Sequence, residues 1–173
     1  MIIKRVHIIG TCGSGKSFLA KKLSSLLKIK VYDLDDIFWK RKYDLKRDEE
    51  TRAKLLKKIA KKDKWIIEGC YSSWAEESIR KCNLLIWLDL STHILTYRLI
   101  LRFFKRKEFK KLEDWKGLRL LLKYAINYHK KGQAAGYYLH KGLIEKHKAS
   151  FVYIRNKKEL NRFLEDFTKM LKK

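Results

Sequence analysis

The chain has 173 residues, 46% of them hydrophobic and 13% aromatic, which is enough to bury a core and excludes disorder of the whole chain. Lys and Arg number 43 against 19 Asp and Glu. The resulting net charge of +24 predicts a positive field that attracts phosphates, nucleic acid or anionic membranes. Because the basic residues are spread along the whole chain, charge alone does not identify a partner.

The cysteines, Cys12, Cys70 and Cys82, show no CxxC spacing, which argues against a disulfide framework or a zinc site and fits a reducing cytosol. No apolar run approaches the roughly 20 residues that a membrane span needs. Charged residues interrupt residues 1–9, so this segment does not have the pattern of a signal peptide. We therefore expect one cytoplasmic domain over residues 1–173, with no membrane partner and with a monomeric or homodimeric state.

Short apolar runs alternate with helix-like stretches along the chain. The predicted strands are residues 2–9, 29–32, 65–67, 84–88 and 150–154, and the predicted helices are residues 17–27, 51–59, 90–104, 118–128 and 159–171. Apolar strands of this kind are buried on both faces, and their alternation with helices predicts an α/β fold with a parallel sheet. Residues 40–50 and the charged residues 105–116 interrupt the alternation, and we interpret them as mobile flaps.

Residues 10–17 read Gly-Thr-Cys-Gly-Ser-Gly-Lys-Ser and match GxxxxGK[ST] at every fixed position. Glycines let the backbone curl with its N–H groups pointing at an anion, and the helix that follows adds its N-terminal partial charge. Because the match follows an apolar strand and opens an amphipathic helix, we interpret it as a nucleotide-binding loop rather than a chance glycine-rich turn. We expect ATP to be contacted by Gly10, Thr11, Cys12, Gly13, Ser14, Gly15, Lys16, Ser17 and Phe18.

Two residues of this loop carry the expected chemistry. Lys16 is placed to reach the β- and γ-phosphates, and the Ser17 hydroxyl is placed to bind Mg²⁺. Cys12 is either a small silent residue or an oxidation-sensitive one.

Carboxylates follow two of the predicted strands, at the edge where ligands bind in an open parallel sheet. We interpret Asp35 as the base or orienting group for an acceptor hydroxyl and Asp33 as a metal residue. The alternative for Asp33 is an N-cap of the following helix. Glu68 ends an apolar strand in the Walker B arrangement, in which the acid holds Mg²⁺ through water. Asp89 is a rival for that role, although helix capping is the preferred interpretation for it.

Arg98 and Arg102 are spaced i, i+4 on one predicted helical face, and Arg106 continues that face. Guanidinium groups suit phosphate oxygens and can stabilise the charge that spreads in phosphoryl transfer. A solvated basic face fits the spacing equally well.

The motifs together resemble the adenylate-kinase-like small kinases. The resemblance rests on residues 10–17, 31–35, 65–69 and 88–89, followed by Arg98 and Arg102. In order and spacing the chain is most similar to the DNA topology-modulation (FlaR-like) family, through residues 35–39, 65–71 and 86–90. The resemblance covers nearly the whole chain and is weakest across residues 105–118.

The resemblance implies a three-layer P-loop fold with a five-stranded parallel sheet, similar to adenylate and shikimate kinases. It also implies an acceptor flap at about residues 36–64 and a helical lid at about residues 103–132. Arg98 and Arg102 then become catalytic residues that contact the nucleotide phosphates. Arg155 would lie in the loop against adenine, with a plain strand-to-helix turn as the alternative.

The expected activity is transfer of the γ-phosphoryl group of ATP to a small-molecule acceptor, with Mg²⁺. The carboxylates of the flap resemble those of shikimate and gluconate kinases and favour a hydroxyl acceptor. Four flap cations could instead hold a phosphate: Arg41, Lys42, Lys46 and Arg47. Four aromatic residues either wall the acceptor pocket or belong to the core: Phe38, Trp39, Tyr71 and Trp74. The alternatives are a nucleoside or nucleotide kinase and a nucleic-acid-associated ATPase or regulator whose nucleic-acid binding is non-specific.

Overall fold

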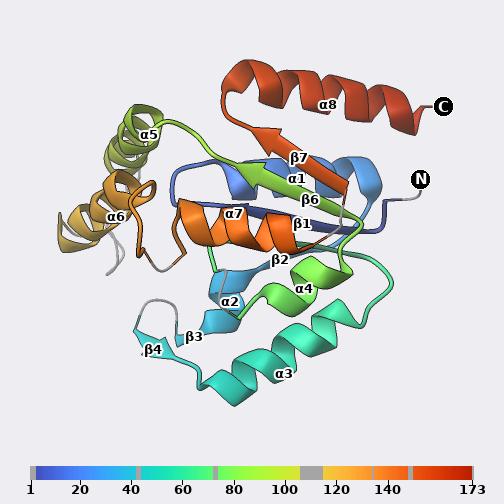
Figure 1. Cartoon of the computed structure of the whole chain (residues 1–173), viewed down its shortest axis with the longest axis horizontal. Coiled ribbons are helices and arrows are strands. Elements are labelled where there is room, and N and C mark those ends of the chain that lie inside the picture. The colour runs from blue at the N-terminus through green and yellow to red at the C-terminus, as the bar shows by residue number, and fades with distance from the viewer. Residues whose placement is uncertain are drawn as a thin grey trace.

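The computed structural model describes residues 3–41, 44–71, 74–105, 115–133, 135–147 and 150–172. A five-stranded parallel sheet in the order β2-β5-β1-β6-β7 lies between layers of helices (Figure 1). Its strands are β1 Arg5–Gly10, β2 Val31–Asp33, β5 Trp65–Gly69, β6 Leu84–Leu88 and β7 Ser150–Ile154. The predicted α/β fold with a five-stranded parallel sheet is therefore confirmed.

The helices and a small hairpin complete the described chain. The helices are α1 Lys16–Leu27, α2 Leu34–Phe38, α3 Glu49–Ala60, α4 Glu76–Lys81, α5 Thr92–Lys105, α6 Trp115–Asn127, α7 Tyr137–Lys146 and α8 Lys157–Leu171. The hairpin pairs β3 Trp39–Arg41 with β4 Leu45–Lys46 in antiparallel fashion. No helix within the described ranges is both long enough and apolar enough to span a membrane.

Different helices cover the two faces of the sheet, because successive side chains along each strand point to opposite faces. Along β1, Val6 and Ile8 pack with residues of α1 and α8, including Leu23 and Phe167. Ile9 points the other way, toward the cluster that holds residues of α2, α3, α4 and α7. The central strands therefore lie between two helical layers, and only the ends of the strands remain for a site.

The α5–α6 pair stands at one end of the molecule, outside these two layers (Figure 1). Leu95, Leu99 and Phe103 of α5 are buried against Leu118 and Ala125 of α6. This pair makes up much of the predicted lid. Arg106 and most of the predicted insertion at residues 105–116 lie outside the described residues.

The predicted flap begins with α2 and continues through the β3–β4 hairpin into α3. The Arg47 side chain holds the end of α2, because its Nη1 donates to the carbonyls of Asp36 at 2.6 Å and Ile37 at 3.0 Å, and also to that of Trp39. Helix C-termini leave such carbonyls unsatisfied, so this arginine caps α2.

Candidate functional site

The loop between β1 and α1 has the backbone that its glycines permit. Gly10 has φ 151° and Gly15 has φ 98°, and residues other than glycine rarely adopt backbone angles in this region. A Cβ at Gly10 would also lie 2.6 Å from the Leu88 carbonyl oxygen. The loop can therefore pack against β6 only with glycine at its first position.

Lys16 and Ser14 line the inside of this loop. The Lys16 ammonium Nζ donates to the Thr11 carbonyl oxygen at 2.9 Å, which folds the side chain across the loop. Ser14 is buried, and its hydroxyl has no hydrogen-bond partner among the described residues. A buried polar group without a partner is costly, so an anion bound in the loop would satisfy it.

Cys12 and Phe18 occupy the outer parts of the predicted nucleotide site. Cys12 Sγ donates to the Leu121 carbonyl at 3.3 Å, so α6 packs directly on the loop. Phe18 is 54% exposed on the first turn of α1, and Lys22 Nζ lies 5.9 Å from its ring centroid. The thiol of Cys12 is free, as are those of Cys70 and Cys82.

The predicted metal residues gather behind the loop. Ser17 Oγ donates to Glu68 Oε1 at 2.5 Å, and Glu68 is only 4% exposed. Asp33 on β2 is the register partner of Glu68 on β5, so both side chains project from the same face of the sheet. The Asp33 carboxylate also accepts from the Asp35 amide at 2.8 Å, so the alternative interpretation as the N-cap of α2 describes a contact that it makes.

A hydroxyl and two carboxylates are the oxygen ligands that Mg²⁺ prefers, so this donor set fits the ion. No group of three or more His, Cys, Asp or Glu side chains arranged for a metal occurs within the described ranges. Ser17, Asp33 and Glu68 would fill part of the coordination sphere of the ion, and substrate phosphates and water would complete it.

Arg98 reaches the loop from α5. Its Nη1 donates to the Ser14 carbonyl at 3.1 Å and would lie 3.5 Å from a Cβ at Gly15. Arg102 follows one turn later on the same helix and is half-buried. The structure thus brings Arg98 to the phosphate loop, a placement that the spacing of the two arginines could not decide.

Asp35 lies in the first turn of α2, directly after β2, beside a group of aromatic rings. Tyr71 Oη donates to Asp35 Oδ1 at 2.7 Å, and the Tyr71 ring stacks on Phe38 with centroids 4.8 Å apart. Trp74 lies 5.2 Å from the Tyr71 ring. Trp39 completes the group, with its ring edge-on to that of Phe38 and the centroids 4.9 Å apart, so all four predicted pocket aromatics form one cluster beside the candidate acceptor carboxylate.

Arg52 belongs to this cluster, although the sequence analysis did not single it out. Its guanidinium carbon lies 4.9 Å from the Phe38 ring centroid and 5.8 Å from that of Trp74. The side chain is 14% exposed, whereas its ion-pair partner Glu49, 3.4 Å away, is 95% exposed. The signal was available in the sequence, because Arg52 precedes Leu55 and Leu56 by three and four residues and so shares their apolar helix face.

The flap cations expected to hold a phosphate have other contacts. Arg41 pairs with Asp44 at 2.5 Å on the surface, and Arg47 caps α2. Lys46 Nζ lies 5.7 Å from the Phe38 ring centroid. Lys42 lies outside the described residues. Arg47 therefore supports the fold of the flap, whereas a phosphate contact by the exposed Arg41 stays a prediction.

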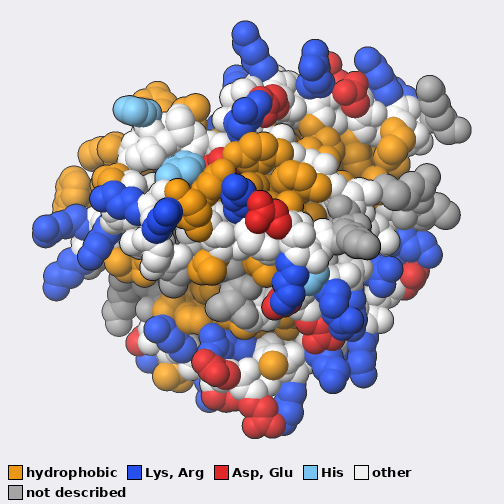
Figure 2. Space-filling model, viewed as in Figure 1, with side chains coloured by type: hydrophobic (Ala, Val, Ile, Leu, Met, Phe, Trp, Pro, Cys, Tyr) orange, Lys and Arg blue, Asp and Glu red, His pale blue; other side chains and the backbone are white. Residues whose placement is uncertain are grey.

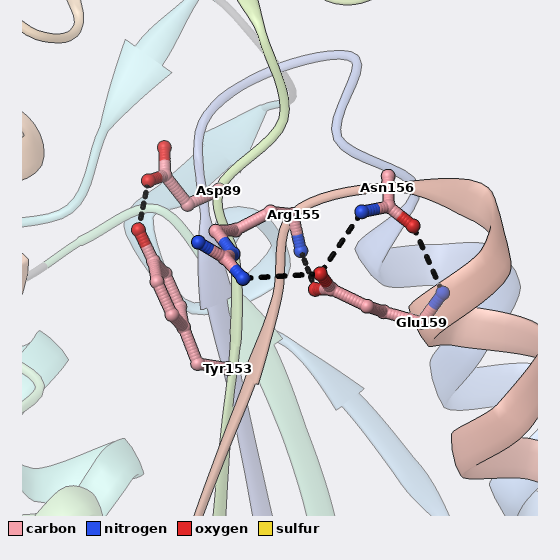
Figure 3. Close-up of polar contacts among 5 residues, drawn as sticks. All are labelled: Asp89, Tyr153, Arg155, Asn156 and Glu159. Carbon is pink, nitrogen blue, oxygen red and sulfur yellow. Dashed lines mark hydrogen bonds and ion pairs between the residues drawn. The ribbon is translucent and has the colours of Figure 1, made fainter.

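Asp89, the rival Walker B residue, is buried and has its own hydrogen-bond partners. Its carboxylate lies 2.7 Å from His129 Nε2. It also accepts from the Tyr153 hydroxyl (Figure 3). These contacts tie β6 to β7 and to the end of α6. Glu68 thus contacts Ser17, whereas the Asp89 carboxylate has His129 and Tyr153 as partners rather than a helix N-terminus, and the Walker B role of Glu68 stays a prediction.

Arg155 sits in the turn between β7 and α8 (Figure 3). Its amide donates to Glu159 Oε2 at 2.7 Å, and its Nη2 lies 3.3 Å from Glu159 Oε1. Asn156 caps α8 by accepting from the Glu159 amide at 2.9 Å. These local contacts match the plain strand-to-helix turn, and the adenine contact of Arg155 stays a prediction.

The sheet order and the phosphate loop define a P-loop nucleotide-binding protein with a small-kinase-like fold. A family model described as "AAA domain" matches residues 6–116, and the chain belongs to that family. The chain is also 34% identical over 104 residues to "Uncharacterized protein YqaC" of Bacillus subtilis (strain 168). That match takes in 60% of this chain and 58% of the relative, so it spans little more than half of the relative's length.

Two solved shikimate kinases share the architecture. The enzyme from Acinetobacter baumannii, in complex with shikimate, has a TM-score of 0.57 and 13% identity, with coverage of 98% of this chain and 93% of that one. The enzyme from Bacteroides thetaiotaomicron has the same TM-score of 0.57 and 16% identity, with coverage of 99% and 100%. At identities this low, the similarity shows that this chain has the same fold as these enzymes and nothing further.

Proposed function

We propose that this protein is an ATP-dependent small-molecule kinase that transfers the γ-phosphoryl group of ATP to a hydroxyl acceptor. The observation that carries this proposal is the placement of Asp35 two residues after Asp33, which is itself the register partner of Glu68 behind Ser17. A carboxylate for the acceptor thus stands next to the carboxylates that fit a nucleotide-bound cation. This arrangement suits phosphoryl transfer, where positioning and charge stabilisation do most of the work.

The phosphate side of the proposed reaction rests on fixed positive groups. The loop amides and the N-terminus of α1 bind the phosphates, while Lys16 and Arg98 neutralise charge on the transferring group. Ser17, Asp33 and Glu68 would hold Mg²⁺, which supplies charge neutralisation on the phosphate oxygens when bound. Arg102 is proposed to act beside Arg98 from the same helix.

The acceptor side rests on Asp35. The acceptor oxygen forms a bond to the γ-phosphorus as the bond from that phosphorus to the bridging oxygen of ADP breaks, and the hydroxyl proton passes to the Asp35 carboxylate. A phosphate acceptor would need little base catalysis, whereas a hydroxyl benefits from this carboxylate. The nearly buried Arg52 guanidinium beside the rings favours an acceptor that also carries a negatively charged group.

A second candidate, a nucleic-acid-associated ATPase as in the FlaR-like resemblance, is favoured by one surface. Helices α5 and α6 contain no Asp or Glu. Figure 2 shows hydrophobic and basic side chains intermixed at the end of the molecule that these helices form. On α6 the basic Lys116, Arg119 and Lys123 lie near the exposed rings of Trp115 and Tyr124. Basic and aromatic side chains together can bind single strands without sequence preference.

The test is ATP turnover with Mg²⁺ in the presence of small hydroxy compounds, nucleosides, nucleoside monophosphates and DNA, each added alone. The proposal predicts stimulation by one class of small hydroxy compound, strongest for members with a carboxylate or phosphate group. Stimulation by nucleoside monophosphates alone would indicate an adenylate-like kinase. Stimulation by DNA alone would indicate the ATPase and contradict the kinase.

A further inference from the structure

The Tyr71 hydroxyl has a fixed direction. Its ring stacks on Phe38 with an interplanar angle of 20°, and its Oη donates to Asp35 Oδ1 at 2.7 Å. Burial, together with the nearby Asp35 carboxylate, raises the pKa of Tyr71 far above its usual value. The hydroxyl therefore keeps its proton and remains a donor to the carboxylate throughout the working pH range.

The backbone that carries Tyr71 is fixed by a buried chain of side chains from distant parts of the sequence. His140 Nε2 lies 3.1 Å from the carbonyl oxygen of Cys70, the residue before Tyr71. His140 Nδ1 lies 2.7 Å from Tyr128 Oη, and Trp87 Nε1 donates to the same Oη at 2.8 Å. These hydrogen bonds therefore connect β6, the segment after α6, helix α7 and the loop after β5.

The direction of each hydrogen bond in this series follows from its two ends, a carbonyl oxygen that only accepts and an indole N–H that only donates. The Cys70 carbonyl can only accept, so His140 Nε2 carries the ring proton, and Nδ1 of the neutral ring accepts from the Tyr128 hydroxyl, whose oxygen in turn accepts from the Trp87 indole N–H. His140 is then the neutral tautomer with its proton on Nε2, which donates to the Cys70 carbonyl. Burial lowers the pKa of His140 to about 4, which agrees with a neutral ring.

We propose that Tyr71 is a positioning residue for the Asp35 carboxylate, held in place by the hydrogen-bond chain of Trp87, Tyr128 and His140. The Tyr71 bond fixes Oδ1, so the carboxylate cannot rotate and its other oxygen is directed at the acceptor hydroxyl. The inference rests on the proposed function, in which Asp35 receives the acceptor proton. It assigns the segment after α6 and helix α7 a role in the acceptor site, although neither belongs to the flap.

The experiment compares Tyr71→Phe with the wild type, using the acceptor that stimulates turnover most in the panel above, or water when none does. Tyr71→Phe keeps the stacked ring and removes only the hydroxyl. We expect kcat to fall about tenfold while KM for ATP changes by less than about twofold, because the lost hydrogen bond orients the base and does not touch the nucleotide. Tyr32→Phe is the matched control, because its hydroxyl accepts from Lys62 Nζ at 2.9 Å on the exposed surface, and it should match the wild type.

A double-mutant cycle separates positioning from a general structural role. If Tyr71 acts through Asp35, then Tyr71→Phe added to Asp35→Asn lowers kcat no further. Tyr128→Phe, which cuts the chain at its middle, should lower kcat less than Tyr71→Phe and should likewise have no effect in the Asp35→Asn background. Thermal unfolding of each variant checks that it is folded.

The outcomes distinguish this inference from the proposed function. Full activity of Tyr71→Phe beside a slow Asp35→Asn would overturn the positioning role and leave the kinase proposal standing. A loss from Tyr71→Phe that is equally large with and without Asp35→Asn would also overturn it. Full activity of Asp35→Asn would instead contradict the proposed base, and with it both proposals.

Discussion

The Ser17 hydroxyl donates to the Glu68 carboxylate at 2.5 Å across 51 positions of sequence. This bond joins the first turn of α1 to the end of β5 and places the acid directly behind the phosphate loop. Glu68 is almost fully buried there, and a buried carboxylate is retained only where donors or a cation satisfy it. The pair therefore marks the position that fits a nucleotide-bound cation.

Replacement of the loop lysine should abolish turnover. Lys16→Ala removes the ammonium that is proposed to contact the phosphates, and we expect kcat to fall by about 10²–10³-fold because that charge would stabilise the transferring group. Steady-state ATP turnover measures the loss, with Lys21→Ala on the exposed side of the same helix as the control. Turnover of Lys16→Ala at the wild-type rate would contradict a role for this loop in phosphoryl transfer.

Removal of the charge on Glu68 should weaken the response to magnesium. Glu68→Gln keeps the size of the side chain and its hydrogen bond to Ser17, but not the charge. We expect the Mg²⁺ concentration for half-maximal turnover to rise by about tenfold to a hundredfold, as for residues that support a bound metal. A Mg²⁺ titration measures this, with the exposed Glu165→Gln as control. An unchanged half-maximal Mg²⁺ concentration would contradict a metal-binding role for Glu68 and would favour Asp33 in that role.

The sequence could predict the sheet and the loop because both depend on local signals. The apolar strands and the glycines of residues 10–17 carry their own pattern, and the structure confirms the fold that they imply. Helix α7 was not predicted, because Gly136 at its start provides no side-chain cap and its apolar residues give only weak periodicity. The short α2 was expected only as the helix that Asp33 would cap in the alternative interpretation, and the short α4 was not predicted.

Partners distant in sequence account for what the sequence could not predict in the candidate site. The apolar helix face of Arg52 could be read from the sequence, but the Phe38 and Trp74 rings that it contacts come from α2 and from the segment after β5. The bond from His140 to Cys70 spans 70 positions. Asp35 was predicted from its place after a strand, but its hydrogen bond from Tyr71 needed the folded chain.

Neutralisation of Arg52 should affect the acceptor and not the nucleotide. We expect Arg52→Gln to raise KM for a negatively charged acceptor by about tenfold or more while KM for ATP is unchanged, because a charge-assisted hydrogen bond is lost only on the acceptor side. Arg52→Lys, which keeps the charge, is the control and should be intermediate. Equal increases in both KM values would indicate that Arg52 supports the fold of the flap instead.

Stability should fall between neutral pH and pH 5. Burial lowers the pKa of His7 to about 3 and that of His140 to about 4, from 6.5. Below pH 6.5 the unfolded chain therefore binds protons that the folded chain does not, and the free energy of unfolding decreases as pH falls toward these values. At pH 5 the loss is about 2 kcal/mol for each histidine.

Urea unfolding at pH 7 and pH 5 measures this loss. The window lies above the range where the surface carboxylates titrate, so the histidines dominate it. His7→Gln should reduce the dependence on pH by about half, since one of the two buried imidazoles is removed. Equal stability of the wild type at the two pH values would show that these histidines are not buried in the neutral form.

Phosphoryl transfer itself is the central claim, and ³¹P NMR of the protein with ATP, Mg²⁺ and the stimulating acceptor observes it directly. The account predicts that the γ-phosphate signal is replaced by ADP and a phosphate-ester signal in equal amounts, with this exchange lost in Asp35→Asn. Formation of ADP and inorganic phosphate alone, at the same rate in Asp35→Asn and faster with DNA, would contradict it.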